Sequence, residues 1–217
     1  MPEAPAKAAI PQVAPTMRTI GLIPAAGKSR RMGRPKLLLP LRETTVLEQV
    51  LAAVRSAGVD EILVVVAPEM DELAQLASAA HAHVLRLAAD TPDMRTTCLH
   101  GLAWIEDHFH PEPGDGCLLL PADHPTLRPD VVRALIAAAQ EDAEKTIIVP
   151  TYAGRRGHPA WLAWSHVAAI RALPTGLGLN AFIRAQTAQT RELPWLSDEV
   201  LCDLDTPEDY ERLTKKK

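Results

Sequence analysis

Short apolar runs alternate along the chain with segments in which apolar residues recur every three or four positions. The continuous runs predict buried strands, because a strand that is covered on both faces has no polar side. The spaced pattern predicts helices with one apolar face. The expected strands are Thr19–Pro24, Glu61–Val66, His83–Leu87, Cys117–Leu120, Thr146–Val149 and Val200–Leu204.

The expected helices carry start and stop signals. Thr45 to Glu48 reads T-V-L-E, which is the spacing of a capping box, and Gly58 is a natural C-terminal stop. A proline in the first turn marks the helix Pro129–Gln140. The other expected helices are Glu69–Ala80, Met94–Asp107, Trp161–Leu173, Leu179–Thr187 and one that begins at Thr206.

Strands that alternate with helices predict an α/β fold, a Rossmann-like three-layer α/β/α sandwich around a mostly parallel central sheet. We expect one domain over residues 18–217, preceded by a disordered Ala/Pro-rich tail over residues 1–17. Ligands of such sheets bind beyond the carboxyl ends of the strands. The loops after Pro24, Leu120 and Val149 are therefore the candidate site.

The composition of the 217 residues narrows the class of function. The formal net charge of -4 argues against a dedicated nucleic-acid binder, and no apolar run approaches the roughly 20 residues that span a bilayer. The three cysteines are scattered and odd in number, a pattern typical of reduced thiols in the cytoplasm. We expect a cytoplasmic protein with no nucleic-acid and no membrane partner.

The loop after the first strand, Ala25–Lys36, reads A-A-G-K-S-R-R-M-G-R-P-K. Small residues let backbone N–H groups approach an anion, and the four cations among its last seven residues would repel one another without a multiply charged partner. This pattern predicts triphosphate binding. Leu22 stands where a Walker A motif needs its first glycine, and Gly27 with Gly33 does not form G-x-G-x-x-G, so both of those motifs are disfavoured.

The stretch Ile23–Lys36 resembles the signature A-A-G-x-S-x-R-M-G-x-x-K of nucleotidyltransferases with a Rossmann-like fold of the nucleotide-diphospho-sugar transferase type. Within that group it looks like the molybdenum cofactor cytidylyltransferase branch, whose members transfer CMP from CTP to molybdopterin. The related guanylyltransferase branch typically has A-G-G where this chain has A-A-G at Ala25, which favours cytidine. The resemblance covers about Thr19 to Leu213 as an ordered series of short motifs.

The resemblance implies roles for particular residues. Arg31 and Lys36 would be the catalytic cations, stabilising charge on the α-phosphate and on the departing pyrophosphate. The segment M-R-T-T from Met94 is similar to the family's Met-Ser-Ser-Ser helix start, and its threonines keep hydroxyls for base or ribose contacts. The nucleotide contacts implied in this way are Pro24, Ala25, Ala26, Gly27, Ser29, Arg31, Lys36, Thr96 and Thr97.

Two acidic motifs are candidates for a metal site. Asp123 follows a buried strand between two prolines, where a carboxylate can ligate a hard cation or simply stabilise a turn. Asp203 and Asp205 are expected at alternate positions of one strand, with a charge at the next helix N-terminus as the other interpretation. These motifs, P-A-D-H-P and C-D-L-D-T-P-E-D, resemble the family's Asp-x-Pro and Asp-x-Asp-Thr-Pro-Glu-Asp motifs. The resemblance implies Mg²⁺ held by Asp123 and Asp205, with Asp203 as the other candidate and His124 as a spacer or substrate contact.

The acceptor is expected near G-R-R-G-H-P, which resembles the Arg-Gly-His-Pro motif of the cytidylyltransferase branch and implies acceptor binding by Arg156, Gly157 and His158. The chain departs from the family at two places. Asp93 stands where a glycine is usual, and T-G-L-G-L-N over Thr175–Asn180 lacks the acid and the arginine of Gly-Asp-x-Gly-Ala-Arg.

These motifs together predict a nucleotidyltransferase that moves a nucleoside monophosphate, CMP from CTP first of all, onto the phosphate of molybdopterin with release of pyrophosphate. One alternative is the same transfer onto a sugar phosphate or alditol phosphate. Another is a non-catalytic nucleotide-binding protein that delivers the cofactor. The resemblance also implies transient contact with a molybdoenzyme or its chaperone.

Overall fold

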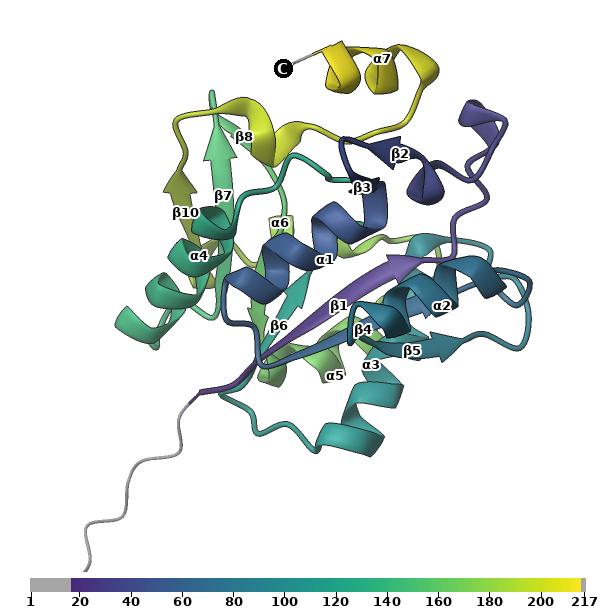
Figure 1. Cartoon of the computed structure of the whole chain (residues 1–217). Coiled ribbons are helices and arrows are strands. Elements are labelled where there is room, and N and C mark those ends of the chain that lie inside the picture. Colours follow the sequence, from purple (N-terminus) through teal and green to yellow (C-terminus); the bar gives the residue numbers. More distant parts are fainter. Residues whose placement is uncertain (1–16, 216–217) are drawn as a thin grey trace, which may run out of the picture.

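The structure, a computed structural model, describes residues 17–215 and contains an eight-stranded sheet with helices on both faces (Figure 1). The strand order is β10-β7-β9-β6-β1-β4-β5, with β8 paired to β7. Neighbouring strands are parallel except β9, which is antiparallel to β6 and β7, and β8. The strands are β1 (Thr19–Ala25), β4 (Glu61–Val66), β5 (His83–Arg86), β6 (Gly116–Leu119), β7 (Ile147–Tyr152), β8 (Arg155–Arg156), β9 (Ala160–Ala163) and β10 (Thr190–Pro194).

Helices α1, α2 and α4 cover one face of this sheet, and α3, α5 and α6 cover the other. A short antiparallel pair, β2 with β3, lies outside the main sheet, and α7 lies beyond it at the top of Figure 1. The bounds are β2 (Pro40–Leu41), β3 (Thr44–Thr45), α1 (Val46–Ser56), α2 (Asp71–Ala79), α3 (Met94–Phe109), α4 (Pro129–Glu141), α5 (Val167–Arg171), α6 (Leu179–Ala185) and α7 (Pro207–Lys215).

The central strand β1 packs against both helical layers. Ile20 and Leu22 belong to the apolar cluster under α3, whereas Ile23 and Ala25 belong to the cluster under α1. This division follows from the strand itself, because successive side chains point to opposite faces. The expected three-layer sandwich with a mostly parallel sheet is confirmed.

Local signals set the start of α1 as expected. The Thr45 side chain accepts a hydrogen bond from Glu48 N at 3.3 Å, and the Glu48 carboxylate accepts one from Thr45 N at 2.7 Å. Two backbone N–H groups at the helix start are thereby satisfied, which is what a capping box does.

The helix predicted over Trp161–Leu173 is wrong at its start. Its first residues form β9, followed by a 3₁₀ turn at Trp164–His166 and the short helix α5. An apolar run of this length fits a strand or a helix equally well, and the backbone pairing offered by β6 and β7 decides for the strand.

The strand predicted over Val200–Leu204 is also wrong. The chain makes a 3₁₀ turn at Asp198–Leu201 and then continues without regular structure, because Leu204 N donates to Asp123 O at 2.9 Å and not to a strand ladder. Strand β10 was not predicted, since this edge strand has the sequence T-R-E-L-P, which contains no apolar run, and only its Thr190 is buried.

Two other expectations concern the chain as a whole. Between residues 17 and 215 the structure contains no helix that is long and apolar enough to cross a membrane. The predicted tail lies outside the described residues except for Met17, which is half-buried and packs against the core.

Candidate active site

Two loops meet at the carboxyl edge of the sheet through one lysine. Lys36, at the end of the loop after β1, places Nζ 2.7 Å from Asp123 Oδ2 and 2.8 Å from Asp205 Oδ1. Asp123 follows β6, and Asp205 precedes α7. The structure thus brings the cationic loop against Asp123, as the strand-end rule predicts, and adds Asp205 to the same contact.

Burial and charge act in opposite directions on these groups. Burial alone raises the pKa of the Asp123 carboxyl, but the hydrogen bond from His124 and the charge of Lys36 outweigh it and hold that pKa well below its usual range. Burial lowers the pKa of the Lys36 ammonium, and the charges and hydrogen bonds of Asp123 and Asp205 reverse that effect, so its pKa is raised. Lys36 and Asp123 are therefore both charged near pH 7.

The cationic loop is folded back on itself at Ser29. The backbone of Ser29 is left-handed, with φ 47°, and its Oγ accepts a hydrogen bond from Lys36 N at 3.1 Å. Arg31 Nη1 lies 2.8 Å from Asp205 Oδ2, although the Arg31 side chain is 72% exposed. The loop therefore presents two cations: the half-buried Lys36 contacts both carboxylates, and the exposed Arg31 contacts Asp205 alone.

Packing requires a glycine in one of the two predicted binding loops but not in the other. A Cβ at Gly27 would meet nothing within 4 Å among residues 17–215, and its φ is not left-handed, so the fold does not require glycine there. A Cβ at Gly157 would lie 2.4 Å from Val200 O, so close packing requires that glycine. Gly27 leaves a stretch of open backbone at the site.

The segment that carries Asp205 is held beside Asp123 by the hydrogen bond from Leu204 N to Asp123 O. Thr206 and Asp209 form a capping box at the start of α7, and the Asp209 carboxylate also accepts a hydrogen bond from Asp205 N at 3.1 Å, which fixes the backbone there. Asp203 is exposed, and only Asp205 of the two contacts Lys36. Since this segment is not a strand, the expected alternation does not place the two side chains on one side.

Two histidines lie next to Asp123. His124 Nδ1 is 3.1 Å from Asp123 Oδ1, and the His124 ring meets the His158 ring edge to face at 4.9 Å. Burial, followed by the charge of His124, lowers the pKa of His158 to about 4, with Asp123 opposing. His158 is therefore neutral near pH 7. Its Nδ1 is buried and has no hydrogen-bond partner within residues 17–215.

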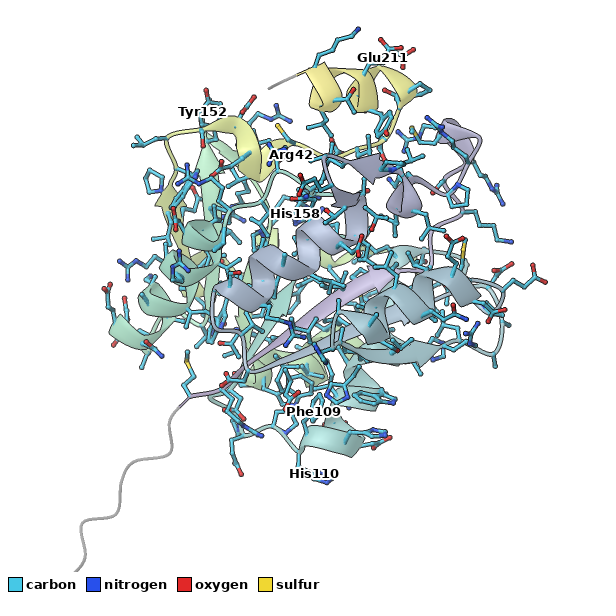
Figure 2. All side chains as sticks on the ribbon, in the orientation of Figure 1. Arg42, Phe109, His110, Tyr152, His158 and Glu211 are labelled. Atoms are coloured by element: carbon cyan, nitrogen blue, oxygen red, sulfur yellow. The ribbon has the colours of Figure 1, made fainter. Side chains whose placement is uncertain are left out.

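The position of His158 agrees with a site at the carboxyl edge. Figure 2 shows His158 in the same half of the molecule as Arg42, away from Phe109 and His110 at the opposite end. The loop after β7 thus joins the other two loops, as predicted from the strand order.

Arg156 is engaged by the protein itself. Its Nε donates to Glu192 Oε1 on β10 at 2.7 Å, and Nη1 donates to Ile183 O on α6 at 3.4 Å. The Arg156 guanidinium is therefore already paired, and His158 is neutral, so neither offers a free positive charge at this loop.

The threonines at the start of α3 form internal hydrogen bonds. Thr96 Oγ1 donates to Asp93 Oδ1 at 2.8 Å, and Thr96 N donates to the same oxygen at 2.7 Å. Thr97 is buried, with Oγ1 2.5 Å from Thr91 Oγ1. Asp93, the departure from the family pattern, is thus the N-cap of α3, and the threonine hydroxyls have partners within the protein.

Asp123 and Asp205 form a donor set that fits one hard cation. Mg²⁺ in proteins is commonly held by one or two carboxylates together with waters and substrate phosphates. Within residues 17–215 no group of three or more His, Cys, Asp or Glu side chains could hold a metal. A metal here would therefore take its remaining ligands from phosphate and water oxygens.

The residue least visible from the sequence is His124, which was expected only as a spacer or substrate contact. No spacing rule predicts that neighbouring side chains meet, because their contact depends on the turn after β6. The bond from Lys36 N to Ser29 was missed for the same reason. An S-x₆-K spacing inside a loop has no general meaning.

Comparisons with known proteins identify the family of the chain. Residues 21–191 match the family model described as the MobA-like NTP transferase domain. Purine catabolism protein PucB of Bacillus subtilis is 28% identical over 206 residues, 90% of this chain and 96% of that protein. A 2-C-methyl-D-erythritol 4-phosphate cytidylyltransferase of Corynebacterium diphtheriae is 31% identical over 139 residues, 60% of this chain and 54% of that protein.

A further relative is a probable molybdenum cofactor guanylyltransferase of Halalkalibacterium halodurans, 27% identical over 137 residues, 63% of this chain and 65% of that protein. Among solved structures, Rv0371c of Mycobacterium tuberculosis in complex with manganese has a TM-score of 0.71 and 27% identity over 92% of this chain and 99% of that one. A nucleotidyl transferase from Methanothermobacter thermautotroptrophicus shares the fold, with a TM-score of 0.74, 24% identity, and 91% and 96% of the two chains covered.

The family match spans most of the sandwich, and it includes both the cationic loop and the loop that carries Asp123. The chain belongs to the MobA-like NTP transferase family and is a nucleotidyltransferase.

Proposed function

We propose that this protein transfers CMP from CTP onto the phosphate of molybdopterin, with Mg²⁺ held by Asp123 and Asp205. The observation that carries the proposal is the contact of Lys36 Nζ with both carboxylates, at 2.7 and 2.8 Å, at the end of the loop that contains Gly27. Cations and carboxylates that alternate at such distances suit a ligand that carries both signs of charge, namely a metal-bound triphosphate.

The charges at the site support this assignment. Lys36 and Arg31 together balance Asp123 and Asp205, so the cluster is formally neutral. A triphosphate offers Lys36 and Arg31 stronger anionic partners, and the freed carboxylates then face its metal. The open backbone at Gly27 lets N–H groups approach the phosphates closely.

The reaction needs little covalent participation by the protein. An acceptor phosphate oxygen, already ionised near neutral pH, forms a bond to the α-phosphorus in line with the leaving group. The bond between the α-phosphorus and the bridging oxygen breaks, and pyrophosphate leaves with that electron pair. Lys36 and Arg31 stabilise the charge that grows on the α-phosphate and on pyrophosphate. Mg²⁺, when bound, supplies further neutralisation of the triphosphate.

The acceptor is assigned to the loop that carries His158. A half-buried neutral imidazole suits hydrogen bonding to a heterocycle such as the pterin edge, and the phosphate would lie toward Lys36. Cytidine is favoured by the A-A-G form of the loop and by the cytidylyltransferases among the relatives. The molybdenum cofactor guanylyltransferase relative supports the molybdopterin acceptor.

An alditol phosphate is the second candidate acceptor. Three relatives are 2-C-methyl-D-erythritol 4-phosphate cytidylyltransferases. The segment Thr175–Asn180, which departs from the molybdenum branch, runs into the first turn of α6, whose Ile183 O accepts from Arg156. A change of acceptor at this point would keep the nucleotide half of the site intact.

Pyrophosphate release by the full-length protein tests these candidates. CTP, GTP and ATP are each supplied with molybdopterin, with 2-C-methyl-D-erythritol 4-phosphate, or with no acceptor, in Mg²⁺ and again after chelation. We expect the fastest release with CTP and molybdopterin, and none without the metal. Faster release with the alditol phosphate selects the second candidate. Tight CTP binding by calorimetry without turnover on any acceptor indicates a delivery protein and contradicts both.

A further inference from the structure

We propose that His124 is a positioning residue that fixes the carboxylate of Asp123 in the orientation needed to hold the metal. This inference rests on the proposed function, because it takes Asp123 as a metal ligand. It assigns to His124 a duty toward a neighbouring side chain and not toward the substrate.

The two oxygens of Asp123 have different partners. Oδ2 lies 2.7 Å from Lys36 Nζ, and Oδ1 lies 3.1 Å from His124 Nδ1. An ionised carboxylate only accepts hydrogen bonds, so Nδ1 is the donor. If the Lys36 ammonium turns to a triphosphate, the bond from His124 is the one that still sets the carboxylate torsion.

The backbone explains how adjacent side chains meet. Leu204 N donates to Asp123 O at 2.9 Å, and Leu127 N donates to His124 O at 3.2 Å, which hold the turn after β6 on both sides. In an extended strand, neighbouring side chains point to opposite faces and this contact cannot form. The turn therefore creates the pair.

The surroundings hold His124 in place. The residue is 5% exposed, and its ring packs edge to face on His158 at 4.9 Å with an interplanar angle of 77°. A buried ring of this kind has little freedom to rotate, so its N–H points steadily at Asp123. Since Nδ1 is occupied by the carboxylate, His124 acts on the metal through Asp123.

Outer partners of metal ligands have measurable effects. Loss of such a hydrogen bond commonly weakens metal affinity or activity by about 10–100-fold. We expect His124→Leu to weaken Mn²⁺ binding by about that factor. His124→Asn keeps an N–H close to the position of Nδ1 and should restore most of the affinity, whereas His124→Gln places its N–H near the position of Nε2 and should not.

The test measures Mn²⁺ binding to the full-length protein by electron paramagnetic resonance of the free ion, with CTP present and no acceptor. His166→Leu is the matched control, because His166 is also a buried histidine with one hydrogen bond, to Thr146 at 2.7 Å, at the amino end of the sheet. It should leave Mn²⁺ affinity unchanged. Thermal unfolding of each variant separates loss of binding from loss of fold.

Asp123→Asn distinguishes failure of this inference from failure of the proposed function. If Asp123→Asn binds Mn²⁺ as the wild type does, the metal site itself is wrong. If Asp123→Asn loses binding while His124→Leu keeps it, the positioning role is overturned. Equal loss in His124→Asn and His124→Gln also overturns it, since the position of the donor would then not matter. If His124→Leu fails to fold, the comparison of His124→Asn with His124→Gln tests the positioning role by itself.

Discussion

The two ends of the sheet hold aspartates, one buried and one half-buried, in different ways. At the amino end, Asp115 is 5% exposed and accepts hydrogen bonds from two backbone N–H groups and from the Arg18 guanidinium. At the carboxyl end, the donors to the Asp123 carboxylate within residues 17–215 are side chains, those of Lys36 and His124. Both carboxyls have a lowered pKa, against the burial that would raise it, yet different kinds of donor lower it.

This difference teaches which charges can exchange partners. Backbone donors are fixed by the fold, so Asp115 anchors the chain that enters β1 to the chain that enters β6. A lysine side chain can turn away to a stronger anion at the cost of a few torsions. The amino end is therefore suited to stability, and the carboxyl end to ligand exchange.

The largest effect is expected from Lys36→Met, which keeps most of the length of the side chain and removes its charge. Loss of a preorganised charge at a phosphoryl transfer centre should slow pyrophosphate release by about 10²–10³-fold. Lys145→Met is the control, because Lys145 donates to Ala188 O at the amino end. It should leave the rate unchanged. A Lys36→Met protein with the wild-type rate would contradict the proposal that Lys36 turns from the carboxylates to the triphosphate.

The next effect concerns pH and His158. Its pKa is about 4 in the folded protein against about 6.5 when unfolded, so between these values the unfolded chain binds a proton that the folded one does not. The contribution of His158 to the free energy of unfolding is therefore constant above about pH 6.5. It falls by about 3 kcal/mol as the pH drops to about 4.

Urea unfolding of the wild type and of His158→Gln between pH 4 and pH 7 measures this contribution. The variant should lose less stability across that window. The pKa of Asp123 is lowered from an ordinary value near 4, so the stability that its ionised form contributes is lost only below that pH. Parallel curves for the two proteins would show that His158 takes up its proton as readily in the fold as outside it.

Asp115→Asn should lower stability and leave the catalytic rate unchanged, whereas Lys36→Met lowers the rate. It leaves the Arg18 guanidinium without its carboxylate, and because Arg18 is 40% exposed we expect a loss of only about 1–3 kcal/mol in unfolding free energy. The catalytic rate per folded molecule should not change. A rate loss without a stability loss would mean that the two ends are not separable.

The smallest effect on stability is expected at Gly27. Since a Cβ meets nothing there and φ is not left-handed, Gly27→Ala should change the unfolding free energy by less than about 1 kcal/mol. The KM for CTP should rise, because the methyl group occupies the space through which phosphate approaches. The matched Gly157→Ala clashes with Val200 O and should destabilise by about 1–3 kcal/mol. A KM unchanged in Gly27→Ala would exclude the backbone of this loop from phosphate binding.

Local patterns predicted much of the fold. The apolar run of β1, the capping box at Thr45 and the helix start after Thr206 each depend on residues close in sequence, and the structure has all three. β9 and the irregular chain before Asp205 were missed, because pairing with strands and hydrogen bonds to Asp123 decided them.

The sequence by itself determined the type of chemistry: a cationic glycine loop after a buried strand, and carboxylates after later elements, because each motif is local and its charge is written in its residues. Only the tertiary structure decided which groups meet. Lys36 joins Asp123 to Asp205, and His124 turns onto its own neighbour, since those contacts depend on the order of strands and on the turns that end them. Distance along the chain carries no information about either contact.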